Sequence, residues 1–443
     1  MGGDQPAGYG AAGDERARLI GINRDAENSA GGSAAPPSDR WNAVYLIMFL
    51  QGMGMLFGWN MFITAVVYFQ DRLVGSNWHD CVENYVTFAF QVCNVGVQLL
   101  LTAYPQDVVF PMLVVNTLVM AACLVLVYLN TTMDVFFAAT IACACLAGVT
   151  CAGVSAGVYG IGGTMPPSHT QAIMSGQALG GIIVAVSSVL FGFLPQTPTG
   201  KQEAAAGYFI VAVVVLLACT ATILILPKLP FMAFYRVKAA TASASEALTR
   251  SQTIGSQSLF ASTFSKVKGL GFWVGLNFLI TLSVFPAVTA DVKTYSFGSH
   301  PAMWVGLYCF LLFNCGDWMG RMLAGWAAGC GLASNGIGLR LLILLRLGFL
   351  PLFMLCNHET TRLPIVFTHD AYPILFMALF AVTNGYAGTV CMMTAPALVS
   401  DGAGMQAGTI MASCLVLGIV LGSTASFGVK FAYTGTDPFC AAG

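Results

Sequence analysis

Four residues of different types share one predicted helical face near residue 317. Asp317 and Arg321 are four positions apart, Asn314 lies three positions before Asp317, and Phe310 lies one turn further back. Residues with this spacing share a face of an α-helix. The face presents an aromatic ring, an amide, a carboxylate and a guanidinium, which suit a small ligand with hydroxyl groups and a flat ring. Sugars and amino acids would also bind to such groups, so the face does not identify one class of ligand. The alternative is an internal ion pair that only fixes helix packing.

Asp317 stands out among the 19 acidic residues because it lies inside an apolar stretch. Placing a charge within a bilayer costs several kcal/mol, so such a residue is expected to have a partner or a function. Arg346 is a second cation of this kind, which could snorkel, pair with Asp317 or bond backbone carbonyls. Trp59 and Asn60 lie deep in the first apolar stretch, too deep for Trp59 to act as an interfacial anchor. A role as glue between helices is the alternative for both.

Signatures of soluble enzymes are missing from the chain. It has no Walker motif, no Gly-rich loop after a strand and no HExxH sequence. Most of the 14 cysteines lie singly in apolar runs, where Cys behaves as a small hydrophobic residue. The sequence therefore predicts no metal site, no cofactor and no enzymatic activity, and without an ATP-binding domain the chain is not a primary pump.

The elements that position these residues follow from composition. Of 443 residues, 57% are hydrophobic and 8% are charged, whereas a soluble domain has about 25% charged residues. A chain so poor in charge needs lipid as part of its solvent. The net charge of −1 gives no sign of a nucleic-acid surface. We predict an all-α polytopic protein of the lipid bilayer. The sequence does not determine an oligomeric state.

Spans of roughly 20 apolar residues are needed to cross the hydrocarbon core. Eleven such stretches are predicted, at about 43–68, 82–104, 108–129, 135–163, 172–194, 205–227, 271–291, 302–327, 336–356, 372–395 and 406–432. We expect a disordered cytosolic tail over 1–40, a six-helix bundle over 41–227, a flexible cytosolic loop over 228–268 and a five-helix bundle over 269–443. Lys and Arg are more frequent on the tail and on the 228–268 loop than on the opposite side, which predicts a cytosolic N-terminus and an extracytosolic C-terminus.

Several motifs, in order along the membrane portion, resemble the equilibrative nucleoside transporter family. They are Gly52–Ala65, Ile173–Gln177, Ser283–Thr289, Asp317–Arg321, Thr383–Tyr386 and Ala407–Met411. The resemblance implies eleven helices in a 6+5 pseudo-symmetric bundle like the major facilitator fold, with a central nucleoside site. Carried over by position, the residues that would bind substrate are Trp59, Asn60, Ile63, Phe285, Phe310, Asn314, Asp317, Arg321 and Val420.

Two positions depart from the family pattern. Family members often have Pro where this chain has Gly58, and Gln where it has Ser155. The family's Gln can contact the nucleobase, and we assign Ser155 to the substrate site at the same position. Ser155 is shorter and has a single hydroxyl, so base preference is in question. Gln91 or Asn94 of the second span could supply an amide in its place.

The function we expect is transport of nucleosides, with purine nucleosides and nucleobases as the finer expectation. The mechanism would be facilitated diffusion by alternating access about a midplane site. The alternative is a proton-coupled nucleoside or nucleobase symporter. Arg321 favours the ionised carboxylate of Asp317, which argues against that residue carrying the proton. Asp107, Asp291 and Asp370, at predicted helix ends, stay open as proton carriers. A membrane receptor or enzyme is the alternative of another class. In the absence of an organelle signal, the plasma membrane is the expected location.

Overall fold

The computed structural model describes residues 36–79, 82–104, 106–192, 197–252, 258–296, 301–331, 336–358 and 361–435. The tail predicted for 1–40 therefore lies almost entirely outside the described residues. Within them the chain is helical, with one isolated β-bridge between Val292 and His358. The helix at the N-terminal end of the described chain begins with a short turn, η1 (Arg40–Asn42).

The first half of the molecule contains seven helices. These are α2 (Ala43–Thr64), α3 (Val66–Arg72), α4 (Val82–Ala103), α5 (Val109–Tyr128), α6 (Met133–Gly163), α7 (Pro167–Gly192) and α8 (Pro198–Ile225), followed by the turn η2 (Leu226–Lys228). Local sequence explains individual boundaries. At the start of α8, Pro198 takes the first helical position and the Thr197 hydroxyl accepts a hydrogen bond from Gly200 N at 3.1 Å, so an otherwise unpaired donor is satisfied.

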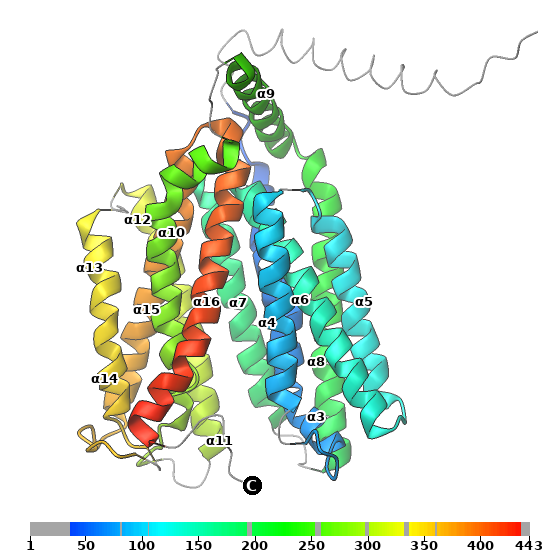
Figure 1. Ribbon diagram of the computed structural model, residues 1–443, viewed down its shortest axis with the longest axis vertical. Helices are drawn as coiled ribbons and strands as arrows, with labels where there is room; N and C mark the ends of the chain where they lie inside the picture. Colours follow the sequence, from blue (N-terminus) through cyan, green and yellow to red (C-terminus); the bar gives the residue numbers. More distant parts are fainter. Residues whose placement is uncertain are drawn as a thin grey trace, which may run out of the picture.

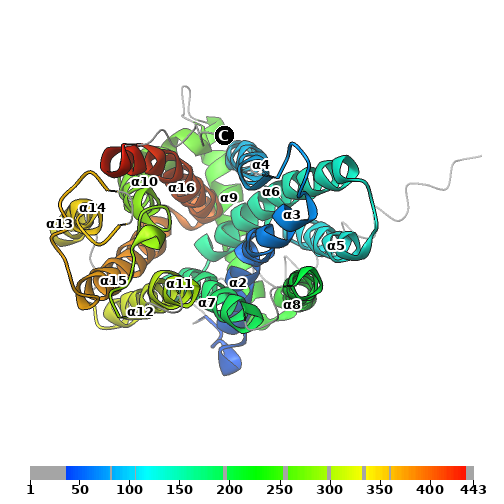
Figure 2. The ribbon, with the colours of Figure 1, turned by 90° about the horizontal axis from the view of Figure 1, so that it is seen from below.

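The second half follows a connecting helix, α9 (Pro230–Gln252). Its longer elements are α10 (Leu259–Val284), α12 (Leu312–Gly329), α15 (Ala371–Thr394) and α16 (Gly404–Thr434). Shorter elements join them: η3 (Thr289–Asp291), α11 (Pro301–Trp304), the π-helical η4 (Val305–Leu311), α13 (Ile337–Leu345), η5 (Arg346–Gly348), α14 (Phe349–Met354), η6 (Ala395–Leu398) and η7 (Asp401–Ala403). The two halves lie side by side, and α9 lies across one end of the bundle (Figures 1 and 2).

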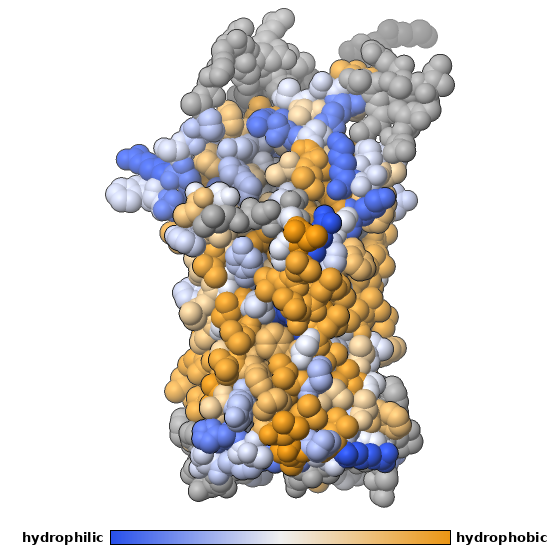
Figure 3. Space-filling view, turned by 90° about the vertical axis from the view of Figure 1, so that its left-hand side faces the viewer, coloured by the Kyte–Doolittle hydropathy of each residue, from blue (hydrophilic) through white to orange (hydrophobic). Residues whose placement is uncertain are grey.

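On the face seen in Figure 3, apolar side chains cover the middle of the bundle, and hydrophilic residues gather toward both ends. Ten helical segments among the described residues are long and apolar enough to cross a membrane. The protein is therefore a multi-pass membrane protein. The segment predicted at 302–327 is also helical, as α11, η4 and α12, but it is not one of these ten because its polar residues lower its mean hydropathy. The total of eleven spans remains a prediction.

The region predicted as a flexible loop, 228–268, is largely helical in the structure. Helix α9 fills most of it and α10 begins at Leu259. Alanine is frequent in α9 and has the highest helix propensity. The helix also docks on the second half, because Lys238 pairs with Asp401 at 3.0 Å and the Ser243 hydroxyl donates to the Gly402 carbonyl at 2.9 Å. A basic composition rich in Ser, Thr and Ala had indicated a loop, whereas helix propensity and docking produce a helix.

We call the end of the bundle that carries α9 the linker side, and the other end the far side. On the linker side the halves touch closely: a Cβ added to Gly408 of α16 would overlap the Tyr159 carbonyl of α6. Between α4 and α16, Gln98 donates to Ser413 at 3.1 Å, and Gln406 donates to the Thr102 carbonyl at 2.7 Å. Toward the far side, α4 and α16 diverge (Figure 1). The structure therefore shows the linker side closed.

Candidate functional site

The ion pair expected from the spacing in α12 is present. Arg321 Nε donates to Asp317 Oδ2 at 2.8 Å, across one helical turn. Both residues are almost completely buried, with 3% of Asp317 and 5% of Arg321 exposed. A buried charge without a partner costs several kcal/mol, so the pair allows two charged groups to lie inside an apolar bundle.

The remaining donors of Arg321 cross to the first half of the molecule. Its Nη1 donates to the Met174 carbonyl at 2.6 Å and contacts Gln177 Oε1 at 3.4 Å, both on α7. The hydroxyl of Tyr159, on α6, donates to the same Gln177 oxygen at 3.0 Å. Arg321 therefore connects the two halves near the middle of the membrane portion, while Asp317 balances its charge.

The second oxygen of Asp317 faces the interior of its own half. Asn384 Nδ2, on α15, donates to Asp317 Oδ1 at 2.7 Å. The amide oxygen of Asn384 accepts in turn from Asn277 Nδ2 at 2.9 Å and from the Thr281 hydroxyl at 2.7 Å. This network holds the carboxylate in one orientation, and every link in it is a hydrogen bond between buried groups.

Arg346 ends the same network. Its exposed fraction is 1%, it donates to the Phe380 carbonyl and to Thr281 Oγ1, each at 2.6 Å, and its guanidinium lies 4.5 Å from the centre of the Phe380 ring. Of the three roles considered for Arg346, bonding to a carbonyl is the one observed. The residue reaches Asp317 only through Asn384, to which it lies at 3.4 Å.

Aromatic residues predicted to contact a ligand are packed within their own halves. Trp59 of α2 stacks on Phe90 of α4, with ring centres 3.8 Å apart. Phe285 stacks on Phe313 at 3.9 Å and meets Phe310 edge-on at 5.9 Å. Phe310 keeps 38% of its surface exposed. Each half therefore contributes one partly exposed aromatic region, from Trp59 in one and Phe310 in the other.

Asn314 lies against the first half. An added Cβ at Gly181 of α7 would overlap the Asn314 amide oxygen, and Asn314 Nδ2 donates to the Phe310 carbonyl at 2.8 Å. Only glycine at 181 lets the amide approach α7 so closely. The predicted face of α12 is thus turned toward the interface between the halves, as its polar character indicated.

Gln91 and Asn94, which the sequence left equivalent as possible base contacts, occupy different surroundings. Asn94 is buried and donates to the Gly148 carbonyl of α6 at 3.3 Å, so it ties two helices of the first half together. Gln91 is half-buried and lies seven residues before Gln98, on the face of α4 that meets α16. Val420 is half-buried and lies seven residues after Ser413, so it shares the Ser413 face of α16.

The other predicted positions are distributed as follows. Ser155 is buried on α6, one turn before Tyr159 and one turn after Cys151, whose sulfur lies 3.2 Å from the Met55 carbonyl of α2. Asn60 is half-buried on α2. The side chain of Ile63 lies outside the described residues. The structure therefore brings Asp317, Arg321 and Asn314 together at the interface.

Four residues of the network were missed by the sequence analysis: Tyr159, Gln177, Asn277 and Thr281. Asn277 and Thr281 are spaced by four in an apolar stretch, which is a usable signal for a shared polar face. Tyr159 and Gln177 gave no such local signal. Among the described residues, no three His, Cys, Asp or Glu side chains are grouped so that they could hold a metal ion.

Asn384→Ala tests whether the network behind Asp317 supports the site. The variant leaves one carboxylate oxygen without its donor, and hydrogen bonds to charged groups contribute about 1.5–3 kcal/mol. We expect a lower melting temperature in detergent and a tenfold or greater loss of solute uptake. Thr394→Ala is the matched control, because this residue of the same helix donates only to Val390 within α15. Equal behaviour of the two variants would contradict the role of Asn384.

Comparison with known proteins gives a consistent picture. The family model described as "Nucleoside transporter" matches residues 141–431. Equilibrative nucleoside transporter 1 of Homo sapiens is 32% identical over 452 residues, covering 88% of this chain and 97% of that protein. Equilibrative nucleoside transporter 2 of Rattus norvegicus is 32% identical over 458 residues, with the same coverage of both chains.

Solved structures with similar folds have low sequence identity. The proton:xylose symporter XylE of the major facilitator superfamily matches with a TM-score of 0.58 and 13% identity, over 87% of this chain and 88% of that one. The E. coli fucose:proton symporter FucP matches with a TM-score of 0.52 and 11% identity, over 89% and 92%. At such identities the likeness concerns the fold alone, and it agrees with the expected major-facilitator-like bundle.

Proposed function

The chain belongs to the equilibrative nucleoside transporter family, and we propose that it carries nucleosides across a membrane by facilitated diffusion. The finer part of the proposal is that purine nucleosides are preferred and that nucleobases are also carried. The family and the fold neighbours are transporters, so the protein is not an enzyme. We place it in the plasma membrane, with the linker side in the cytosol, because basic residues are concentrated there.

The observation that carries the mechanism is the Arg321 connection between the halves. In the linker-closed state Arg321 is held by Asp317 of its own helix and by Met174 and Gln177 of α7. Ribose hydroxyls can replace the α7 acceptors, because a guanidinium donates equally to a carbonyl or a hydroxyl oxygen. A bound nucleoside would then replace the direct contact between Arg321 and α7, and the two halves could move relative to each other around the nucleoside.

Base recognition in this proposal uses surfaces from both halves. Trp59 and Phe310 would flank the base, as each retains some exposure within its own half. A flat base gains roughly 1–3 kcal/mol by stacking on an aromatic ring. Gln91 would contact the base edge, since it is half-buried and lies seven residues before Gln98, on the face of α4 that meets α16.

Transport by purified protein in lipid vesicles is the direct test. We expect saturable influx of radiolabelled adenosine, inhibited by other purine nucleosides more strongly than by uridine, and unchanged by an imposed pH gradient or membrane potential. Influx that rises with an inward proton gradient would establish the symporter alternative. No flux of any nucleoside or nucleobase would contradict the proposed transport and favour a membrane receptor.

The two amides of α4 provide a test of base selectivity. Gln91→Leu removes an amide that faces α16, so the ratio of adenosine to uridine uptake should change severalfold, as expected for loss of about 1 kcal/mol of hydrogen bonding. Asn94→Ala serves as the comparison, because the Asn94 amide is buried and already donates to the Gly148 carbonyl of α6, and it should leave the ratio unchanged. An unchanged ratio in Gln91→Leu would remove Gln91 from the site.

A further inference from the structure

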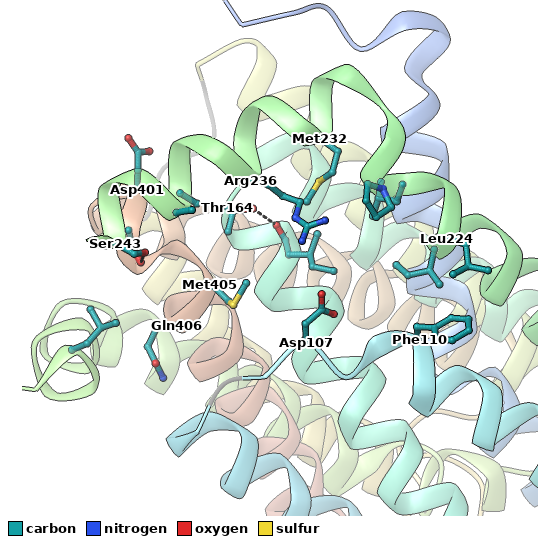
Figure 4. A pocket seen from close by; sticks show the side chains of 18 residues that line it. Asp107, Phe110, Thr164, Leu224, Met232, Arg236, Ser243, Asp401, Met405 and Gln406 are labelled. Atoms are coloured by element: carbon teal, nitrogen blue, oxygen red, sulfur yellow. Dashed lines mark hydrogen bonds between the residues drawn. The ribbon is translucent and has the colours of Figure 1, made fainter. Parts of the chain in front are cut away.

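A large cavity lies under α9 on the linker side, away from the Asp317 network. Its volume is about 740 Å³, within the range of sites for drug-sized ligands, about 300–1,000 Å³. The walls come from three parts of the molecule: Asp107 and Phe110 from the first half, Arg236 from α9, and Met405 and Gln406 from α16. Figure 4 shows Arg236 and Asp107 pointing into the cavity from opposite walls.

The two charged groups in the cavity do not pair with each other. Within the described part of the chain, neither the Arg236 guanidinium nor the Asp107 carboxylate has an ion-pair or hydrogen-bond partner, although nearby Lys238 pairs with Asp401. A ligand with both an anionic and a cationic group would satisfy both walls. Guanidinium groups bind phosphate through two parallel hydrogen bonds, and a carboxylate accepts hydrogen bonds from a primary ammonium.

The apolar side of the cavity indicates that this ligand is a lipid. Phe110, Leu224 and Met405 line the cavity, keep 41%, 51% and 40% of their surface exposed, and belong to candidate membrane spans. Asp107 and Arg236 lie just outside those spans. The cavity therefore begins at the level of the lipid headgroups and continues along surfaces that face hydrocarbon. A soluble phosphate compound would leave these apolar walls in contact with water.

We propose that the cavity binds a membrane phospholipid with a phosphoethanolamine headgroup, the phosphate at Arg236 and the ammonium at Asp107. The site exists only while the linker side is closed, because α16 forms part of its wall and α6 another part. A ligand stabilises the conformation to which it binds. The lipid therefore favours the linker-closed conformation. Binding itself does not depend on the proposed transport function.

Lipid titrations of the purified protein in detergent test the binding site. Phosphatidylethanolamine should raise the melting temperature saturably and at lower concentration than phosphatidylglycerol, which has no ammonium group. Arg236→Ala should weaken the apparent affinity about tenfold or more, as expected for loss of a charge-assisted hydrogen bond of about 1.5–3 kcal/mol. Asp107→Asn should abolish the preference between the two lipids.

Lys266→Ala, an exposed basic residue of α10 outside the cavity, is the control and should behave as wild type. Equal stabilisation of the wild type by both lipids, or full stabilisation of Arg236→Ala, would overturn the proposal. Soluble phosphoethanolamine alone should give no shift; if it matches the lipid, the ligand is a soluble compound and the lipid assignment is wrong. If the purified protein shows no nucleoside transport but still binds the lipid, the proposed function is contradicted and the lipid site is not.

Discussion

Arg321→Ala is expected to abolish nucleoside uptake. Arg321 holds Asp317 at 2.8 Å and the Met174 carbonyl at 2.6 Å, so its loss removes the proposed sugar contact and the bridge between the halves. Each charge-assisted hydrogen bond contributes about 1.5–3 kcal/mol, and each 1.4 kcal/mol is a factor of ten. Uptake should therefore fall to about a hundredth of the wild-type rate or less, measured with radiolabelled adenosine in transfected cells.

The design must separate lost transport from lost folding, because an unpaired Asp317 is costly, by about 3–5 kcal/mol. Surface biotinylation gives the amount of transporter at the membrane. The double variant Asp317→Asn/Arg321→Gln keeps two hydrogen-bonding side chains without charge and should reach the surface while remaining inactive. Arg340→Ala, an exposed arginine of α13, should transport normally. Wild-type uptake in Arg321→Ala would contradict the proposed site.

Gly408→Ala should also greatly reduce uptake, for a different reason. A Cβ at this position would overlap the Tyr159 carbonyl, where α16 and α6 touch on the linker side. Closely packed helices cannot absorb such an overlap without moving apart. Because the contact joins the two halves, each half can still fold, but the linker-closed state becomes unfavourable. We expect uptake to fall about tenfold, as for a penalty of about 1.4 kcal/mol on one state of the cycle.

Conformation can be measured directly in the same variant. Spin labels on Gln106 and Ala397, two exposed residues on the linker side of opposite halves, should report longer distances in Gly408→Ala than in the wild type. Gly428→Ala is the matched control, because this glycine of the same helix has nothing within 4 Å of an added Cβ. An unchanged distance distribution in Gly408→Ala would show that the α6–α16 contact does not limit closure.

Local patterns predicted local contacts correctly. The Asp317–Arg321 pair follows from a spacing of four in one helix, and its formation is confirmed. The partners supplied by other helices were not predictable. Asn384 is 67 residues from Asp317, and Met174 is 147 residues from Arg321, so no periodicity within one helix could identify them. For the same reason the sequence could not distinguish Gln91 from Asn94, because their difference in burial and hydrogen bonding comes from the helices that pack on α4.

Composition was informative for spans and misleading for the linker. A basic run rich in Ser, Thr and Ala was interpreted as a loop, but Ala-rich α9 is a helix because it docks on η7 through Lys238 and Ser243. The segment carrying Asp317 is less apolar than the ten candidate spans, since the polar face that marks it as functional also lowers its hydropathy. Composition alone therefore underestimates segments that carry polar sites.

The sequence by itself determined that this is a membrane protein and that one face of α12 carries both a carboxylate and a guanidinium. The first conclusion rests on the composition of the chain. The second rests on the helical repeat, which relates residues only one or two turns apart. Only the tertiary structure decided what that face meets: Arg321 bridges to α7, Asp317 is held by Asn384, and the cavity under α9 joins three separate segments. These contacts depend on how distant helices pack, because buried polar groups take whichever partners the packed neighbours provide.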